Sequence, residues 1–215
     1  RLAHVAPGAP NVTLQRNGGA RSEATNVSYP TITDYFNVDN SSATWSVQAT
    51  ASGATVGSTT SFESKRGHKY TILAVADSAA SNSIATIDDP TNRSLISDDS
   101  LFRAFNASFN AQNIDVYLIG LNESVNNTTP ALQGIAFKNA KPDSGSDGRR
   151  SRGGDYQVVV TTAGTKTVLA KGKVTVPDNR DVLFVTVPND VNSPTGINLL
   201  VKFQGQPGAS LVPAI

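Results

Sequence analysis

The two histidines of the chain, His4 and His68, are the first residues to consider for catalysis or metal binding. A metal site would need both to converge with a third ligand, and a hydrolase would need one beside a nucleophile and a carboxylate. His4 lies in a predicted strand near a proline-rich turn, and His68 lies in the turn before another strand. We therefore expect a strand-end histidine bonded to the backbone and a solvated turn histidine.

No familiar catalytic motif accompanies the histidines. The sequence has no Cys, no G-x-S-x-G nucleophile elbow and no H-E-x-x-H zinc motif. This predicts that the chain is not an enzyme, with a hydrolase of dispersed site residues as a minor alternative.

Aspartate pairs are the better candidates for a metal site. Two pairs flank a polar junction near the middle of the chain: Asp88, Asp89, Asp98 and Asp99. Calcium prefers carboxylate and carbonyl oxygens from flexible loops, and residues 143–148 are similar to the start of a calcium loop. However, Gly145 stands where that loop would need a further side-chain ligand. Calcium is thus the one cofactor that the sequence allows, and solvated turn carboxylates are the alternative.

One basic run could bind an acidic glycan or a lipid headgroup. It consists of Arg149, Arg150 and Arg152. The alternative is that these arginines keep a loop solvated, because neighbouring aspartates largely cancel their charge.

Aromatic side chains in loops could stack on sugar rings, because a ring face offers apolar contact to the CH groups of a sugar. The candidates in or near predicted loops are Tyr29, Tyr35, Phe36 and Phe109. Core packing is the alternative for all four. Trp45 opens an alternating strand with Val47 and Ala49, which predicts a place in the core.

Composition narrows the choice of partners. A net charge of +1 gives no long-range field for collecting phosphates, so we expect no nucleic-acid partner. The sequence contains no apolar stretch long enough to span a bilayer. Because Arg1 already lies in the first predicted strand, we expect that a leader was removed, and that membrane attachment needs an N-terminal lipid anchor.

The elements that would hold these residues are strands. Apolar residues alternate with polar ones or come in short runs, and no long window keeps the three-four spacing of a helix. Turn-forming clusters separate the runs. This pattern predicts an all-β chain built as sandwiches of immunoglobulin-like size.

The chain also contains a repeat, in which residues 1–18 align without gaps to residues 103–120 at an offset of 102 residues. The apolar pairs of this alignment that we expect to be buried are Val12/Ile114 and Leu14/Val116. Two further matches follow in the same order, residues 45–53 with 156–164 and residues 70–75 with 182–187.

The repeat predicts two tandem immunoglobulin-like antiparallel β-sandwich domains, residues 1–97 and residues 101–215, each with its own core. The short polar junction between them predicts restricted domain motion. Residues 138–154 of the second domain are rich in Gly, Ser and charge, which predicts an inserted mobile surface loop without a strand.

The opening of the repeat resembles the bacterial family called domain of unknown function 4397. Matching residues in the first copy are Arg1, His4, Pro7, Ala9, Pro10 and Val12. Those in the second copy are Arg103, Ser108, Ala111, Ile114, Asp115, Val116 and Tyr117. Residues 33–35 and 67–75 match later features of the family, whereas the second copy has Asn106, Phe109 and Gln112 in place of the histidine and the two prolines. The resemblance implies tandem β-sandwiches and an exported, often lipid-anchored, cell-envelope protein, and it implies no activity.

The combined expectation is a non-catalytic exported protein of the periplasm or cell surface. It would act as a binding or structural module for an envelope protein or a glycan, with a carbohydrate-binding module as the alternative. Because proline fixes the backbone of a loop, we expect the first copy to hold the site. The binding residues expected there are His4, Pro7, Pro10 and Tyr35, with Arg149, Arg150 and Arg152 as a second candidate.

Overall fold

The computed structural model describes residues 1–90, 98–192, 194–206 and 208–212. The described residues form strands and two short 3-10 turns, η1 (Ser22–Ala24) and η2 (Val125–Asn127), and they contain no α-helix. This confirms the prediction of an all-β fold. The predicted end of the first domain at residue 97 lies outside the described residues. Within the described ranges, no helix has the length and apolar character needed to cross a membrane.

The first half folds into two four-stranded sheets. One has the order β4 (Thr31–Ile32), β1 (Leu2–Val5), β7 (His68–Ala76) and β8 (Asn82–Pro90). The other has the order β3 (Gly19–Ala20), β2 (Val12–Arg16), β5 (Ser42–Ala49) and β6 (Thr60–Glu63).

The second half repeats this strand order. One sheet runs β11 (Leu132–Ile135), β10 (Ile114–Gly120), β14 (Gly154–Thr162) and β15 (Val168–Val176). The other runs β12 (Ala140–Lys141), β9 (Asp99–Asn106), β16 (Asp181–Pro188), β17 (Ile197–Phe203) and β18 (Ser210–Leu211), and β13 (Arg149–Arg152) also pairs with β9. Pairing is antiparallel except for one parallel pair in each half, β1 with β7 and β9 with β16.

Strand pairing tests directly which residues of the two halves are equivalent. Ala3 pairs with Leu73, and Phe105, which is equivalent to Ala3 in the repeat, pairs with Val185. Leu73 and Val185 are therefore equivalent, as the match between residues 70–75 and 182–187 predicted. The match that aligned Trp45 with Tyr156 is wrong by two residues. Arg16 pairs with Trp45, and Leu118, which lies 102 residues after Arg16, pairs with Val158. The error arose because a slip of two residues keeps the same side chains on the inner face of a strand.

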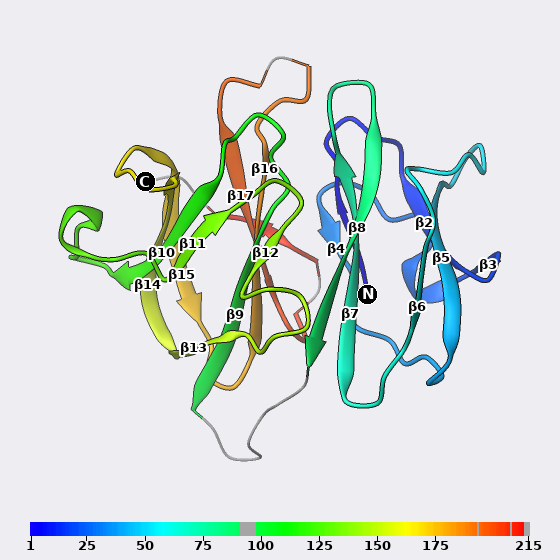
Figure 1. Ribbon diagram of the computed structural model, residues 1–215, viewed down its shortest axis with the longest axis horizontal. Helices are drawn as coiled ribbons and strands as arrows, with labels where there is room; N and C mark the ends of the chain where they lie inside the picture. The colour runs from blue at the N-terminus through cyan, green and yellow to red at the C-terminus, as the bar shows by residue number, and fades with distance from the viewer. Residues whose placement is uncertain (91–97, 193, 207, 213–215) are drawn as a thin grey trace.

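Each half has an apolar core between its two sheets, and a third core joins the halves. The third core packs the sheet of β1 and β7 against the sheet of β9 and β16. Its buried members include Leu73, Val75, Phe105, Leu183, Val185 and Leu200. Figure 1 accordingly shows four sheets as successive layers, from β2, β5 and β6 at one side to β10, β14 and β15 at the other.

Ion pairs surround this shared core. Arg103 Nη2 lies 2.7 Å from Asp89 Oδ1, with the Arg103 side chain 2% exposed. Lys69 pairs with Asp181 at 2.7 Å, and the fully buried Lys202 pairs with Asp34 at 2.8 Å. Each pair connects one half to the other, so charged and apolar contacts together fix the two sandwiches to each other.

The prediction of a strand-free mobile loop at residues 138–154 is wrong. β12 and β13 lie within this segment and both pair with β9. Between them, Ser144 Oγ accepts from the Asp88 backbone nitrogen and the Gly145 nitrogen donates to Asp88 O, each at 2.8 Å. The pairing depends on backbone groups, which a composition rich in Gly, Ser and charge does not reveal.

Candidate active surface: an aromatic pocket in the first half

A pocket of about 530 Å³ lies between the two sheets of the first half, with loop residues 35–40 and 64–67 at its mouth. We call it the aromatic pocket. Its lining consists of Arg1, Leu14, Tyr35, Phe36, Asn37, Val38, Asn40, Trp45, Phe62, Ser64, Lys65, Arg66, Gly67, His68, Lys69, Tyr70, Ile72 and Gln204. Small-molecule sites commonly span roughly 300 to 1,000 Å³, so the pocket has the size of a ligand site.

The floor of the pocket is part of the first core. Leu14, Trp45 and Ile72 are all buried, and Trp45 is 3% exposed, as expected from its place in an alternating strand. Strand β5 alternates buried and more exposed residues from Ala43 to Ala49, and this alternation directs the indole inward. The floor is therefore rigid and apolar.

A row of stacked rings forms one wall. Trp45 and Phe62 stack with centroids 5.8 Å apart, and Phe62 and Tyr70 stack at 4.7 Å. His68 continues the row, 6.2 Å from Tyr70. The rings come from β5, β6 and β7, so the row bridges both sheets of the sandwich.

Tyr70 also holds the loop that follows β6. The Lys65 backbone nitrogen donates to the Tyr70 hydroxyl oxygen at 3.2 Å. Burial of the hydroxyl raises the pKa of Tyr70 above its ordinary value, so the group stays protonated at neutral pH. The wall and the mouth of the pocket are thus joined through one side chain.

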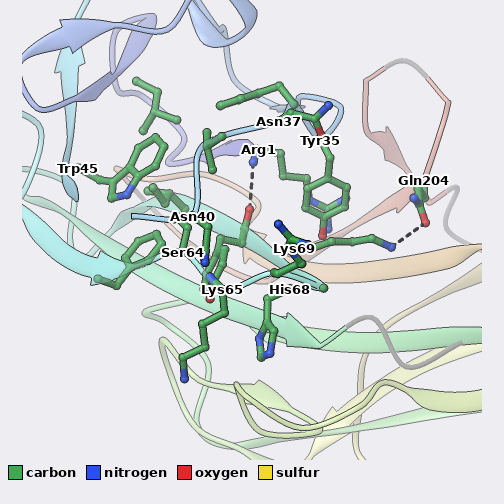
Figure 2. A pocket seen from close by; sticks show the side chains of 18 residues that line it. Arg1, Tyr35, Asn37, Asn40, Trp45, Ser64, Lys65, His68, Lys69 and Gln204 are labelled. Atoms are coloured by element: carbon green, nitrogen blue, oxygen red, sulfur yellow. Dashed lines mark hydrogen bonds between the residues drawn. The ribbon is translucent and has the colours of Figure 1, made fainter. Parts of the chain in front are cut away.

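Tyr35 lies away from Trp45, beside Lys69 (Figure 2), and two cations lie close to its ring. The Arg1 guanidinium carbon lies 4.2 Å from the ring centroid, and Lys69 Nζ lies 5.7 Å from it. Arg1 Nε donates to Thr71 Oγ1 at 2.9 Å, which fixes the guanidinium over the ring. Burial raises the pKa of Tyr35, so its hydroxyl is a neutral hydrogen-bonding group.

The second half supplies one residue of the lining. Lys69 Nζ donates to Gln204 Oε1 at 3.4 Å and to Asp181 Oδ2 at 2.7 Å, and Figure 2 shows Lys69 extended toward Gln204. The aromatic pocket is therefore complete only when both halves are in place.

Two buried polar atoms in the lining residues lack a hydrogen-bond partner among the described residues. They are Trp45 Nε1 and Ser64 Oγ, and both residues are 3% exposed. Buried polar groups are usually paired, and an unpaired one in a structure points to a partner or a function. Here both atoms belong to residues that line one pocket.

His68 Nδ1 lies 2.7 Å from Asp88 Oδ1, and a hydrolase would need such a contact between its base and its carboxylate. His68 therefore lies at the start of a strand beside a carboxylate, and the prediction of a solvated turn histidine is wrong. Ser64 lines the same pocket, but its Oγ has no hydrogen-bond partner among the described residues. A nucleophile held by its base is thus missing from this described part of the pocket.

Of the four binding residues predicted for the first copy, only Tyr35 lines the aromatic pocket. His4 is 0% exposed, and its Nε2 lies 3.0 Å from Pro10 O. This agrees with the expected backbone-bonded histidine and leaves His4 unable to meet a surface ligand. Pro7 is buried and Pro10 is exposed, and neither lines the pocket.

The four aspartates near the junction do not lie in one cluster. Asp88 pairs with His68 and Asp89 with Arg103, both where the halves meet. Asp99 lies 3.6 Å from Arg150, and Asp98 is exposed. Among the described residues, no three or more His, Cys, Asp or Glu side chains come together as a metal site would require.

The basic run lies on strand β13, on the sheet that faces the first half. Arg149, Arg150 and Arg152 are exposed, and none of them lines the aromatic pocket. Arg152 borders a separate open depression with Asp98, Asp99 and Asp178. The structure therefore does not bring these arginines together with Tyr35.

Sequence reasoning missed several residues of the pocket, above all Phe62, Tyr70, Lys65 and Arg66. The available signal was the position of Tyr70 at the start of its strand, where a ring can leave the core and reach the sandwich end.

Comparison with protein families provides the identification. The family model described as Domain of unknown function (DUF4397) matches residues 1–117, more than half of the chain. The chain belongs to this family. No curated protein matches the chain. The DUF4397 match covers every residue that lines the aromatic pocket except Gln204.

Proposed function

We propose that this DUF4397 chain is a non-catalytic binding module that takes a saccharide into the aromatic pocket. The observation that carries the proposal is the row formed by Trp45, Phe62 and Tyr70 in the wall of a 530 Å³ pocket. Aromatic rings provide apolar surface for the CH faces of a sugar ring. Asn37, Asn40 and Gln204 add amide groups that can donate and accept hydrogen bonds to hydroxyl groups.

The proposal includes export to the periplasm or the cell surface, with a lipid anchor as the means of attachment. A chain with a net charge of +1 that is rich in Ser, Thr and Asn fits such a location. Cell fractionation with an antibody against the natural protein tests this part: we expect the protein in the envelope or medium. Recovery in the cytoplasm would contradict it.

Trp45 gives a direct test of binding, because it is the one tryptophan of the chain and it lines the pocket. We expect the tryptophan emission of the full chain to change on titration with a saccharide selected on a glycan array. Tyr70→Ala should weaken this binding about tenfold or more, since it removes a ring and a hydroxyl group from the wall of the pocket.

Tyr156→Ala is the matched control. Tyr156 is a half-buried tyrosine of the second half and does not line the pocket. It should leave saccharide affinity unchanged. An array without any bound glycan, or equal losses in both variants, would contradict the proposed function.

A structural role in the envelope is a second candidate, and the shared core between the halves favours it. A unit with few internal hinges would suit a spacer between a membrane and a partner protein. Small-angle scattering tests this: we expect one compact particle without variable separation of the halves, and a distribution of separations would argue against a spacer.

A further inference from the structure

We infer that the saccharide bound by the aromatic pocket is anionic and carries carboxylate groups, as a uronic acid does. This inference rests on the proposed function and narrows its ligand class. It depends on residues outside the aromatic wall, so an experiment can contradict it without contradicting the proposed function.

Among the described residues, the charged side chains that line the pocket are basic. They are Arg1, Lys65, Arg66 and Lys69, together with His68, whereas the nearby acidic residues Glu63 and Asp88 line a neighbouring depression with Lys65 and Tyr70. In a chain with 18 basic and 17 acidic residues, this bias is local. Such a concentration of one charge in a concave, partly apolar site favours a ligand of the opposite charge.

One of these cations already has an acidic partner, because Lys69 pairs with Asp181 at 2.7 Å. The His68 ring contacts Asp88 at 2.7 Å. Lys65 and Arg66 differ, because neither side chain has an acidic partner among the described residues. Arg1 also has no acidic partner among the described residues, but it is 7% exposed and lies over the Tyr35 ring. Lys65 and Arg66 are therefore the exposed side chains with charge to offer a ligand.

The positions of Lys65 and Arg66 suit a ligand that stacks on the rings. Both residues follow the end of β6 at Glu63 and come directly after Ser64, and the Lys65 backbone nitrogen donates to the Tyr70 hydroxyl. Both side chains are exposed, whereas Trp45 and Ser64 of the same lining are buried. A sugar ring in contact with Tyr70 would thus place an exocyclic carboxylate close to two cations.

A carboxylated sugar fits this set of groups better than a bare anion. An inorganic anion would use the cations but leave the apolar wall and the amides of Asn37 and Asn40 unused. A neutral sugar would use the wall and the amides but leave the cations without a partner. Charge-assisted hydrogen bonds to a carboxylate are stronger than those to a hydroxyl, so the charged ligand should bind more tightly.

The test compares tetragalacturonate with its fully methyl-esterified form, using the full chain, Trp45 emission and calorimetry. We expect the acid to bind about tenfold more tightly than the ester at low salt, and added salt should weaken the acid more than the ester. The double variant Lys65→Gln/Arg66→Gln should weaken the acid about tenfold and the ester much less, so that the two ligands bind with similar affinity.

The matched control is Lys171→Gln/Lys173→Gln, which removes two exposed cations from β15 in the second half. It should keep the preference for the acid. Equal affinity for acid and ester, with both weakened by Tyr70→Ala, would overturn the inference and leave the proposed function standing. Equal loss in the two double variants would also overturn it, because net charge alone would then explain the preference. Failure of acid, ester and all neutral glycans to bind would overturn the proposed function itself.

Discussion

His4 and Asn106 stand at equivalent positions of the two halves, and each bonds the backbone carbonyl six residues further along the chain. His4 Nε2 lies 3.0 Å from Pro10 O, and Asn106 Nδ2 lies 3.4 Å from Gln112 O. Both side chains are 0% exposed. The offset of 102 residues between His4 and Asn106 is the offset of the repeat, so different residue types close the same turn.

The two residues differ in how completely they are bonded. The Asn106 amide also bonds Ile135 O, the Ser108 nitrogen and Thr186 Oγ1. His4 Nδ1 has no partner among the described residues. Because Pro10 O can only accept, Nε2 carries the ring hydrogen, and a second proton on Nδ1 would be buried without an acceptor. Burial accordingly lowers the pKa of His4 below its usual value near 6.5.

This lowered pKa predicts a pH dependence of stability. As the pH falls below 6.5, the unfolded chain protonates His4 more readily than the folded chain, so the free energy of unfolding falls. We expect this loss to be measurable between pH 6.5 and about 5. Urea unfolding at both pH values should show a smaller loss in His4→Asn than in the natural chain. An equal reduction in His68→Asn, the control for removing a histidine, would contradict the assignment to His4.

The shared core predicts that the halves unfold together. Leu200 belongs to the second half, is 0% exposed and packs in the core between the halves. Leu200→Ala should lower the free energy of unfolding by about 2 to 5 kcal/mol. The loss should be visible in the emission of Trp45, which reports on the first half. Leu211→Ala, at a position 51% exposed, should leave that transition in place. A Trp45 transition unaffected by Leu200→Ala would mean independent halves.

Arg103 predicts the behaviour of residues 138–154. Its guanidinium pairs with Asp89 and donates to three backbone carbonyls of this segment, Pro142 O, Asp143 O and Ser146 O. Removing one partner of a buried ion pair costs about 3 to 5 kcal/mol, so Arg103→Met should be strongly destabilising. Trypsin should also cleave the variant after Lys138 and Arg149 under conditions that leave the natural chain intact. Equally fast cleavage of the natural chain would show that the segment is not held.

Two glycines provide a matched pair for backbone effects. Gly53 and Gly57 both have positive φ, at 70° and 75°. A Cβ at Gly57 would lie 2.7 Å from Ser83 Cα, whereas a Cβ at Gly53 would meet nothing within 4 Å. Gly53→Ala should cost about 1 kcal/mol, and Gly57→Ala should cost clearly more, because strand β8 must also move. Thermal unfolding of both variants measures the difference, and equal costs would show that the contact relaxes freely.

Sequence patterns predicted which segments form strands better than they predicted which residues of the two halves are equivalent. The alternation of Trp45, Val47 and Ala49 predicted a buried indole, and the structure confirms it. The same periodicity aligned Trp45 of the first half with Tyr156 of the second, although Val158 is the equivalent residue. Period-two patterns identify the inner face of a strand but leave its register open by two residues.

The candidate site was less predictable, because it depends on contacts between distant segments. Phe62 and Tyr70 approach within 4.7 Å from strands of different sheets, and Gln204 arrives from the other half. Tyr35 was singled out for its place in a loop, which is a local property. His4 was singled out for its match to a family pattern, which does not distinguish a buried structural residue from a binding residue.

The central core has a consequence for how such a chain can change during evolution. The sheet of β1 and β7 and the sheet of β9 and β16 each turn an apolar face toward the other. A single repeat would leave that face open to water, and covering it would require association with a second polypeptide. Connecting both faces in one chain makes this association intramolecular and independent of protein concentration. Duplication, deletion or shuffling of one repeat would therefore change the oligomeric state before it changed the fold of either sandwich.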